Sequence, residues 1–282
     1  MKFLTLNTHS LLEVDYERKL DQFVEGILRE RPDIIALQEV NQSCDAEILE
    51  PDQLKGQYPV PGCMSIRRDN HAAQVAQRLH QAGVTCYWAW VPIKLGYGRF
   101  DEGMAVLSLG RRIRCIDQFP ISRSRDYRNW RTRAVLGIQV EGLDDWFYTV
   151  HMGWWDDELE RFLDQWNTLN CCVMSKRMCG TVWLLGDFNA PAEVHGQSYE
   201  LMVASGWVDT YTTAQCRDEG ITVSGPIDGW KQKEGQTARN MRLDYIWCSR
   251  KREIRSSKVI FNGIREPVVS DHYGVLVEVK AS

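Results

Sequence analysis

The sequence predicts an α/β (α+β) protein in which two packed mixed sheets are flanked by helices. Two observations support this prediction. Short apolar segments of strand length are numerous along the chain, whereas only three segments show the 3.6-residue apolar period of an amphipathic helix. So few helices among so many strands favour two sheets packed on each other over a regular alternation of strand and helix.

The first helical segment, residues 13–31, is the clearest, because Leu20, Phe23, Val24 and Ile27 fall on one face. The other helical candidates are residues 72–79 and 159–178. The predicted strands are residues 2–6, 34–37, 87–91, 104–109, 134–140, 146–150, 182–185, 245–248, 258–261 and 275–279. Residues 45–70 and 218–239 are polar and irregular, so we expect surface loops that border a site.

The composition is that of an ordinary globular protein. Of 282 residues, 44% are hydrophobic and 26% are charged, which excludes a disordered, collagenous or disulfide-stapled chain. The net charge of −4 disfavours nucleic acid as the main partner, because its backbone needs a broad basic face. No apolar run approaches the ~20 residues of a spanning helix, and no signal-peptide core follows Met1. With nine cysteines and no C-x-x-C pair, we expect a cytoplasmic protein with no membrane partner.

Polar side chains of metal-ligand or acid/base type stand at the ends of six predicted strands. A single one is weak evidence, since a Glu after a strand is more often a solvated turn residue. Six positions of useful chemical type in one chain are hard to explain by chance, and strand ends are where α/β architectures place their sites. The positions are Asn7, Gln38-Glu39, His151, Asp187-Phe188-Asn189, Asp244 and Asp271-His272.

This pattern resembles the endonuclease/exonuclease/phosphatase superfamily, which shares the fold of deoxyribonuclease I. The residues that carry the resemblance appear in the family's order and span nearly the whole chain. It implies a four-layer α/β/β/α sandwich and, because these residues must converge, a single domain over residues 1–282. The motifs are Leu6-Asn7, Leu37-Gln38-Glu39-Val40, Gly186-Asp187-Phe188-Asn189, Leu243-Asp244-Tyr245-Ile246 and Ser270-Asp271-His272.

The resemblance implies a metal-dependent hydrolase of phosphate esters. Such a reaction needs charge neutralised on the non-bridging oxygens, a water aimed in line, and a stabilised leaving oxygen. Glu39 offers a hard carboxylate oxygen suited to Mg²⁺, with Mn²⁺ as the candidate substitute. By resemblance Glu39 is the primary metal ligand, and Asn7 and Asp271 lie beside it.

The remaining catalytic roles also come from the resemblance. Asp187 would orient or deprotonate the attacking water, and Asn189 would donate a hydrogen bond to the phosphoryl group. His272 would contact a phosphate oxygen while Asp244 holds its other ring nitrogen.

His151 matches the second histidine of the deoxyribonuclease and sphingomyelinase branches, and Glu102 stands where those branches keep its carboxylate partner. The abasic-site endonuclease branch lacks this histidine. His9, His71, His80 and His195 show no partner pattern, so we expect them at surface or core positions.

The substrate is less constrained than the reaction, because one fold hosts several activities. Eight arginines lie between Arg111 and Arg133, so a nuclease groove is conceivable. The acidic stretch of residues 13–52 argues against it. We expect one or two arginines, Arg131 or Arg133 beside Trp130, to hold a terminal phosphate.

Trp154 and Trp155 follow His151 closely and could stack on sugar rings or bases. The segments around Asn7, Glu39, His151 and Asp187 resemble a Firmicute-type group that includes the maltose 6'-phosphate phosphatases. The leading prediction is a Mg²⁺-dependent phosphatase acting on a small sugar phosphate. A metal-dependent endonuclease, exonuclease or other phosphodiesterase is the first alternative, and a non-enzymatic binding module is the second.

Overall fold

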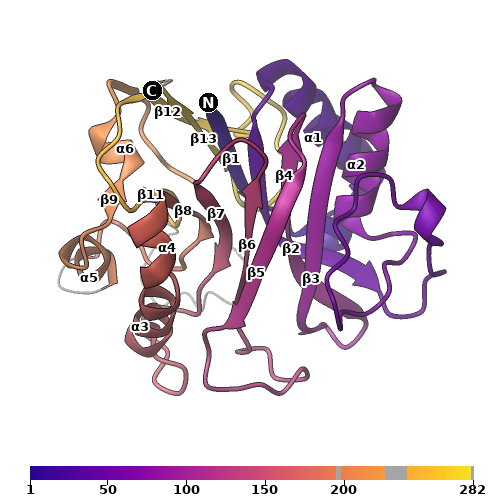
Figure 1. Ribbon diagram of the computed structural model, residues 1–282, viewed down its shortest axis with the longest axis horizontal. Coiled ribbons are helices and arrows are strands. Elements are labelled where there is room, and N and C mark those ends of the chain that lie inside the picture. The colour runs from indigo at the N-terminus through magenta and orange to yellow at the C-terminus, as the bar shows by residue number, and fades with distance from the viewer. Residues whose placement is uncertain (195–197, 226–239, 281–282) are drawn as a thin grey trace.

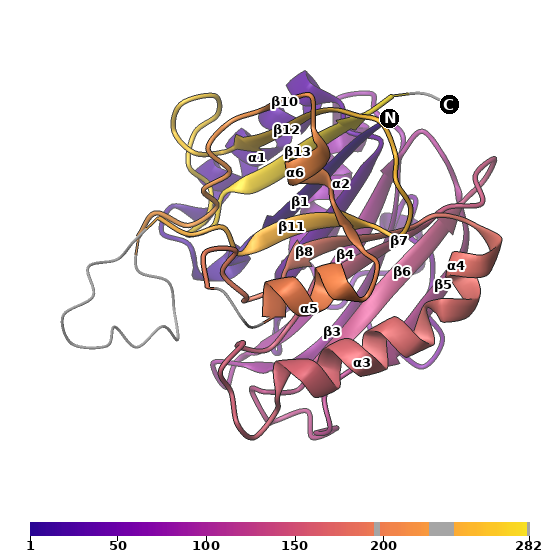
Figure 2. The same cartoon turned by 90° about the vertical axis from the view of Figure 1, so that its left-hand side faces the viewer.

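The computed structural model describes residues 1–194, 198–225 and 240–280. These residues form two mixed β-sheets packed face to face, with helices on both outer faces (Figures 1 and 2). In Figure 1, α1 and α2 lie on one side of the pair of sheets, and α3, α4 and α5 lie on the other. The predicted four-layer α/β/β/α sandwich is therefore confirmed.

The first sheet has seven strands. Its neighbours β1 and β2 run parallel, as do β10 and β12, and the other pairs are antiparallel. In spatial order the strands are β10 (Cys216–Arg217), β12 (Ile254–Ile260), β13 (Gly274–Val279), β1 (Lys2–Asn7), β2 (Ile34–Ser43), β4 (Phe100–Leu109) and β3 (Cys86–Gly96).

The second sheet has six strands. Only β7 and β8 run parallel within it. In spatial order the strands are β5 (Ile113–Pro120), β6 (Ala134–Val140), β7 (Trp146–His151), β8 (Val182–Asp187), β11 (Asp244–Cys248) and β9 (Val208–Asp209).

The helices cover the outer faces of the sheets. Helices α1 (Tyr16–Glu30) and α2 (His71–Gln81) pack on the first sheet, and α3 (Phe162–Cys172) and α5 (Ser198–Ala204) pack on the second. The short elements are α4 (Met174–Cys179), α6 (Thr210–Thr213) and the 3₁₀ turns η1 (Ser10–Leu12) and η2 (Pro51–Gln53).

Alternation along β1 explains why the sheet has two apolar faces, because successive side chains of a strand point to opposite sides. Leu4 and Leu6 pack under α1 and α2. Phe3 points to the other sheet, where its ring meets those of Phe147 and Trp183 edge-on at 5.2 and 4.8 Å. Burying such aromatic surface between the sheets fixes their relative position.

The structure differs from the predicted elements in three places. The helix expected over residues 159–178 breaks at Val173 into α3 and α4. Strand β5 was not predicted, because its polar side chains face solvent at the edge of the sheet and hide the apolar pattern. The two-residue strands β9 and β10 are too short to leave a pattern. Of the predicted loop at 218–239, residues 226–239 lie outside the described residues.

Candidate active site

The predicted site residues meet where central strands of both sheets end. Asn7 ends β1, Asp187 ends β8, and Glu39 lies in β2. The Asn7 amide donates to Glu39 Oε1 at 3.0 Å and to Asp187 Oδ2 at 3.2 Å, so one side chain joins the ends of the two sheets. Just below, Gln38 Nε2 donates to Thr149 Oγ1 at 2.8 Å, which ties β2 to β7.

Two backbone features set the positions of the acidic side chains. Glu39 has a φ of 52° at a break in the pairing of β2 with β4, and such a bulge redirects a side chain from the regular alternation. Gly186, with a φ of 157°, precedes Asp187, and a Cβ there would lie 1.8 Å from the Val150 carbonyl oxygen. Only glycine therefore lets β8 approach β7 so closely before Asp187.

Asp187 and Asn189 form a compact turn after β8. The Asn189 backbone amide donates to Asp187 Oδ1 at 2.8 Å, and Asn189 itself has a φ of 48°. The Asn189 side-chain amide donates to the Met152 carbonyl oxygen at 3.0 Å and lies 3.3 Å from Asp187 Oδ2. Both side chains are buried, so their orientation is fixed before any ligand arrives.

His272 and Asp244 form a buried pair. His272 Nδ1 lies 2.9 Å from Asp244 Oδ2, and His272 Nε2 lies 3.9 Å from Asp187 Oδ2. The hydroxyl of Ser270 donates to the Asn7 carbonyl oxygen at 2.7 Å and thereby anchors the loop that carries Asp271 and His272 to β1.

A cavity of about 380 Å³ collects most of the predicted site residues. Asn7 and Asp244 lie next to it through their hydrogen bonds to Glu39 and His272. A larger surface hollow of about 950 Å³, along α2, contains none of the predicted site residues. The cavity is lined by Glu39, Lys94, Leu95, Gly96, Tyr97, Glu102, Trp130, Arg133, His151, Trp154, Asp187, Asn189, Asp271 and His272.

The carboxylates of this cavity carry negative charge that the protein does not fully offset. Burial, followed by the charges of Glu102 and Asp271, raises the pKa of Glu39. Burial and the charge of Asp244 raise the pKa of Asp187 to about 7, although His272 opposes the shift. Both carboxylates would be stabilised by an added cation.

The two histidines are shifted in opposite directions. Burial lowers the pKa of His272, but Asp244 and Asp187 outweigh it and raise that pKa well above 6.5, so the ring is protonated at neutral pH. Burial and the charges of Arg133 and Lys94 lower the pKa of His151 well below 6.5, so this ring is neutral. Its Nε2 lies 3.6 Å from Asp187 Oδ2 and 4.0 Å from Glu39 Oε1.

Glu102 does not pair with His151 as the resemblance implied. Its carboxylate forms an ion pair with Lys94 Nζ at 2.9 Å, and no hydrogen bond joins it to His151 in the described part of the chain. Lys94, on β3, is a cavity residue that the sequence analysis missed, since a lone Lys in an apolar strand gives no pattern.

Two expected substrate contacts lie elsewhere. The Arg131 guanidinium pairs with Asp157 at 2.6 Å and stacks over Trp130 at 4.3 Å, and Arg131 is not part of the cavity lining. Arg133, two residues later, lines the cavity instead. Trp154 also lines it, whereas Trp155 packs against the core beneath α3.

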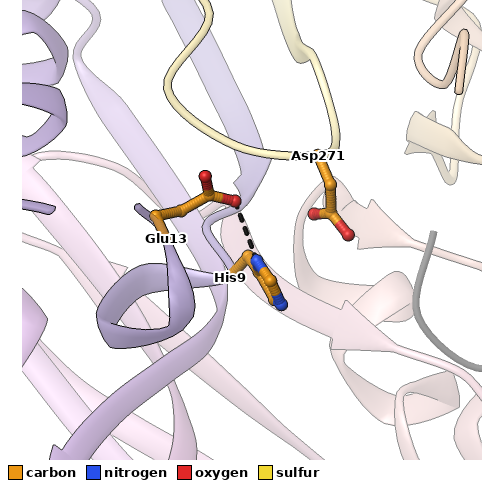
Figure 3. A group of neighbouring side chains, drawn as sticks. All are labelled: His9, Glu13 and Asp271. Carbon is orange, nitrogen blue, oxygen red and sulfur yellow. Dashed lines mark hydrogen bonds and ion pairs between the residues drawn. The ribbon is translucent and has the colours of Figure 1, made fainter. Parts of the chain in front are cut away.

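His9 lies beside the site, although no pattern predicted it. Figure 3 shows its ring between Glu13 and the Asp271 loop, with Nδ1 2.8 Å from Glu13 Oε1. Ligand atoms of these three residues lie within 4.8 Å of one another. Burial opposes protonation, but the Glu13 hydrogen bond and the Asp271 and Glu39 charges raise the pKa of His9 to about 9. In the sequence, only the i,i+4 spacing of His9 and Glu13 indicated that these two side chains could contact each other.

The donor set fits a divalent cation. Glu39 and Asp271 offer hard carboxylate oxygens to the cavity, and the Asn7 amide, which donates to Glu39 Oε1, lies next to them. The raised pKa of Glu39 reflects charge in need of compensation. Asp187, Asp244 and His272 form a second buried group whose ligand atoms lie within 4.8 Å of one another.

Comparison with known proteins agrees with this arrangement. A sequence model of the Endonuclease/Exonuclease/phosphatase family matches residues 4–272. An endonuclease/exonuclease/phosphatase family protein from Leptotrichia buccalis is 31% identical over 100% of both chains, with a TM-score of 0.84. The chain matches none of the curated proteins.

Two further solved structures are similar in fold alone. A mannosyl-6-phosphatase from Bacteroides thetaiotaomicron is 16% identical over 100% of both chains, with a TM-score of 0.65. TDP2 from Caenorhabditis elegans is 16% identical over 100% of this chain and 74% of its own, with a TM-score of 0.62.

The fold and site are those of a phosphoesterase with a buried Asp/His cluster, from a class that typically depends on a metal ion. The chain belongs to the endonuclease/exonuclease/phosphatase family. In the described ranges, no helix is both long and apolar enough to cross a membrane.

Proposed function

We propose that the protein is a Mg²⁺-dependent phosphomonoesterase that releases inorganic phosphate from a sugar phosphate, with a maltose 6'-phosphate-like compound as the leading candidate. The observation that carries this proposal is one cavity whose lining combines acidic and imidazole groups with aromatic rings from Tyr97, Trp130 and Trp154. Flat apolar rings suit the faces of a sugar, and about 380 Å³ lies in the range of small-molecule pockets.

The proposed metal ligands are Glu39, Asn7 and Asp271. When bound, Mg²⁺ supplies charge neutralisation on the non-bridging phosphate oxygens. Glu39 provides the carboxylate, and Asp271 and the Asn7 amide lie near it. The Asn7 amide contacts both Glu39 and Asp187, so it positions the ligand side of the cavity relative to the catalytic side.

The remaining roles follow from protonation states and hydrogen bonds. Asp187, with a pKa of about 7, is placed to take a proton from the attacking water. Protonated His272 donates from Nε2 to a phosphate oxygen, while its Nδ1–H donates to Asp244. Asn189 is the proposed donor to the phosphoryl group, for which its side-chain amide would give up its 3.3 Å contact with Asp187 Oδ2. Neutral His151 acts as a hydrogen-bond donor, and Glu102 holds Lys94 in the cavity wall.

The fold does not choose the substrate by itself, because proteins described as a mannosyl-6-phosphatase and as TDP2 share it. The first of these supports the proposal, since it indicates that this architecture can accept a phosphorylated sugar. We further propose that residues 1–282 act as one domain, because the site residues come from both ends of the sequence, and that the protein is cytoplasmic.

The test is release of inorganic phosphate from a panel that includes maltose 6'-phosphate, mannose 6-phosphate and glucose 6-phosphate. Supercoiled plasmid is assayed for nicking in parallel. We expect phosphate release that requires Mg²⁺, stops with a chelator, and is lost in Glu39→Ala. Nicking that disappears in Glu39→Ala, without phosphate release from any monoester, would replace the proposal by a nuclease.

A further inference from the structure

Arg133 is a buried cation without a carboxylate partner. Its side chain is 4% exposed and lines the cavity. The guanidinium donates to three backbone carbonyl oxygens, those of Met152 at 3.3 Å, Trp130 at 2.7 Å and Thr132 at 3.1 Å. Among residues 1–194, 198–225 and 240–280, no carboxylate oxygen lies within 4.0 Å of it. Burial lowers the pKa of Arg133, and the charges of Glu102, Glu39, Asp187 and Asp157 oppose that shift without making contact. A buried cation that no carboxylate touches can still accept an anion in the cavity.

Lys94 is a second cation in the same lining. It is 8% exposed, and one carboxylate, that of Glu102, holds its ammonium group at 2.9 Å. Burial, and after it the positive charge of Arg133, lowers the pKa of Lys94, so the two cations of this lining act on each other. Two buried like charges repel; Glu102 offsets part of this cost, and a bound phosphate would offset more of it.

The two cations reach the cavity from different elements than the proposed catalytic groups. Lys94 comes from β3, and Arg133 from the loop that leads into β6. Asp187 ends β8, and Asn189 and His272 come from the turns after β8 and before β13. A phosphate in the cavity can therefore be contacted by the catalytic groups and by the two cations at once.

The number of free oxygens separates the two classes of phosphate ester. A monoester carries three non-bridging oxygens and about −1.5 to −2 charge at neutral pH, whereas a diester has two such oxygens and a single charge. An arginine fork binds two oxygens of one phosphate at the same time. Backbone carbonyl oxygens already occupy Nε and Nη1 of Arg133, so its Nη2 group remains for phosphate oxygens and favours the additional oxygen and charge of a monoester.

We propose that Arg133, with Lys94 beside it, forms a subsite for the free oxygens of a terminal phosphate and so selects phosphate monoesters over diesters. This inference rests on the proposed function and assigns its substrate class to named residues.

Arg131 supplies a matched control from the same loop. It is the same residue type two positions earlier, but Asp157 already pairs with its guanidinium and it lies outside the cavity lining. A general effect of removing positive charge from this loop would appear in both variants, whereas a phosphate subsite would appear only in the Arg133 variants.

The experiment compares the wild type with Arg133→Met, Arg133→Lys, Lys94→Met and Arg131→Met. The probes are 4-nitrophenyl phosphate as the monoester and bis(4-nitrophenyl) phosphate as the diester. We expect Arg133→Met to lower kcat/KM for the monoester by about 10- to 100-fold and for the diester by about threefold or less. Arg133→Lys keeps the charge without the fork, so we expect an intermediate loss. Lys94→Met should lower the ratio of monoester to diester kcat/KM as Arg133→Met does. Arg131→Met should leave that ratio unchanged.

Equal losses on both probes in Arg133→Met, or no loss on either, would overturn the inference. Thermal unfolding shows whether each variant folds. If Arg133→Met does not fold, the ratio of monoester to diester kcat/KM in Arg133→Lys decides. Calorimetric titration with inorganic phosphate gives a readout without turnover, in which Arg133→Lys binds more weakly and Arg131→Met binds as the wild type does. A wild type that hydrolyses no monoester refutes the proposed function, while the phosphate titration still decides the subsite.

Discussion

Asp187 is the side chain on which the polar contacts of the site converge. Its carboxylate accepts hydrogen bonds from the Asn7 side chain and from the Asn189 backbone amide, and both imidazoles of the cavity lie within 4 Å of Oδ2. These contacts hold one carboxylate rotamer in a buried position. The raised pKa of about 7 then follows from burial and from Asp244, and it matches what a general base needs near neutral pH.

At the same scale, the adjacent tryptophans separate substrate binding from packing. Trp154→Ala should raise KM for a disaccharide phosphate more than for 4-nitrophenyl phosphate, because it removes an aromatic wall of the cavity. Trp155→Ala should lower the free energy of unfolding by up to about 3 kcal/mol, since its ring packs on the core. Steady-state kinetics and urea titration measure the two effects. A disaccharide-specific rise of KM in Trp155→Ala would contradict this division.

At the scale of elements, Glu160 anchors the loop between β5 and β6 that carries Trp130 and Arg133. Its buried carboxylate accepts the backbone amides of Arg123 at 2.8 Å and Ser124 at 2.7 Å. Glu160→Ala leaves both donors unpaired, so we expect a loss of about 2–4 kcal/mol in unfolding free energy and a higher KM for the sugar phosphate. Urea unfolding and phosphate-release kinetics measure these changes.

The control for Glu160 is Asp164→Asn. Asp164 pairs with Arg123 and Arg161 at the surface, where ion pairs contribute little to stability. The free energy of unfolding of Asp164→Asn and its KM for the sugar phosphate should stay close to those of the wild type. If both variants behave alike, the loop is not held by the Glu160 carboxylate.

Packing of α1 against α2 makes the protein sensitive to acid through His71. Its Nδ1 lies 3.0 Å from the Tyr16 hydroxyl, and burial with the charge of Arg78 lowers the pKa of His71 to about 3. The ring stays neutral in the folded state, whereas the unfolded chain takes up a proton below about pH 6.5. The contribution of neutral His71 to the free energy of unfolding is therefore complete above about pH 6.5 and is lost as the pH falls toward 3.

His71→Gln keeps an acceptor for Tyr16 and cannot be protonated. Between about pH 6 and pH 4 the slope of unfolding free energy against pH should fall by about 1.4 kcal/mol per pH unit relative to the wild type. Urea titrations across this range measure it. An unchanged slope would assign the acid sensitivity to other groups.

The elements that the sequence predicted well are those whose burial is one-sided or complete. Leu20, Phe23 and Ile27 of α1 are all buried, and the fully apolar run at the start of β2 was recognised. Strand β5 was missed because it lies at the edge of its sheet and only Ile113 in it is buried, so Arg114, Asp117 and Gln118 leave no apolar alternation. The break between α3 and α4 at Val173 involves no Pro or Gly, so no local residue indicated it.

At the scale of the whole molecule, carboxylates from distant segments meet in one cavity, and metal binding should therefore stabilise the fold. With Mg²⁺ at about 100 times its dissociation constant we expect a gain of about 2.7 kcal/mol in unfolding free energy. Glu39→Gln should abolish this gain and, without metal, should be more stable than the wild type, because the pKa of Glu39 is raised in the folded state. Thermal unfolding with and without Mg²⁺ measures both.

The exposed Asp52→Asn is the control for Glu39 and should keep the full gain from Mg²⁺. A metal-dependent gain that persists in Glu39→Gln would place the metal elsewhere.

The strand-end motifs identified the cavity, but they did not specify every contact in it. The strand-end positions together with the family resemblance led us to expect that Asn7, Glu39, Asp187 and His272 would meet. The pairing of Glu102 with Lys94 depends on the register of β3 against β4, where these two residues are direct neighbours. The choice between Arg131 and Arg133 depends on the path of a loop whose anchors are tertiary. Neither could be derived without coordinates.

The neighbours of β1 have a consequence for synthesis of the protein. β1, near the amino end, pairs with β13, near the carboxyl end, and the Met1 amino nitrogen lies 2.9 Å from the Val279 carbonyl oxygen. On the ribosome, this edge of β1 stays uncovered until residues 274–279 have been synthesised, and such non-local pairing is slow to form. Until β13 pairs with it, this edge of β1 is open to aggregation, and the site to which Asn7 and His272 contribute is not assembled.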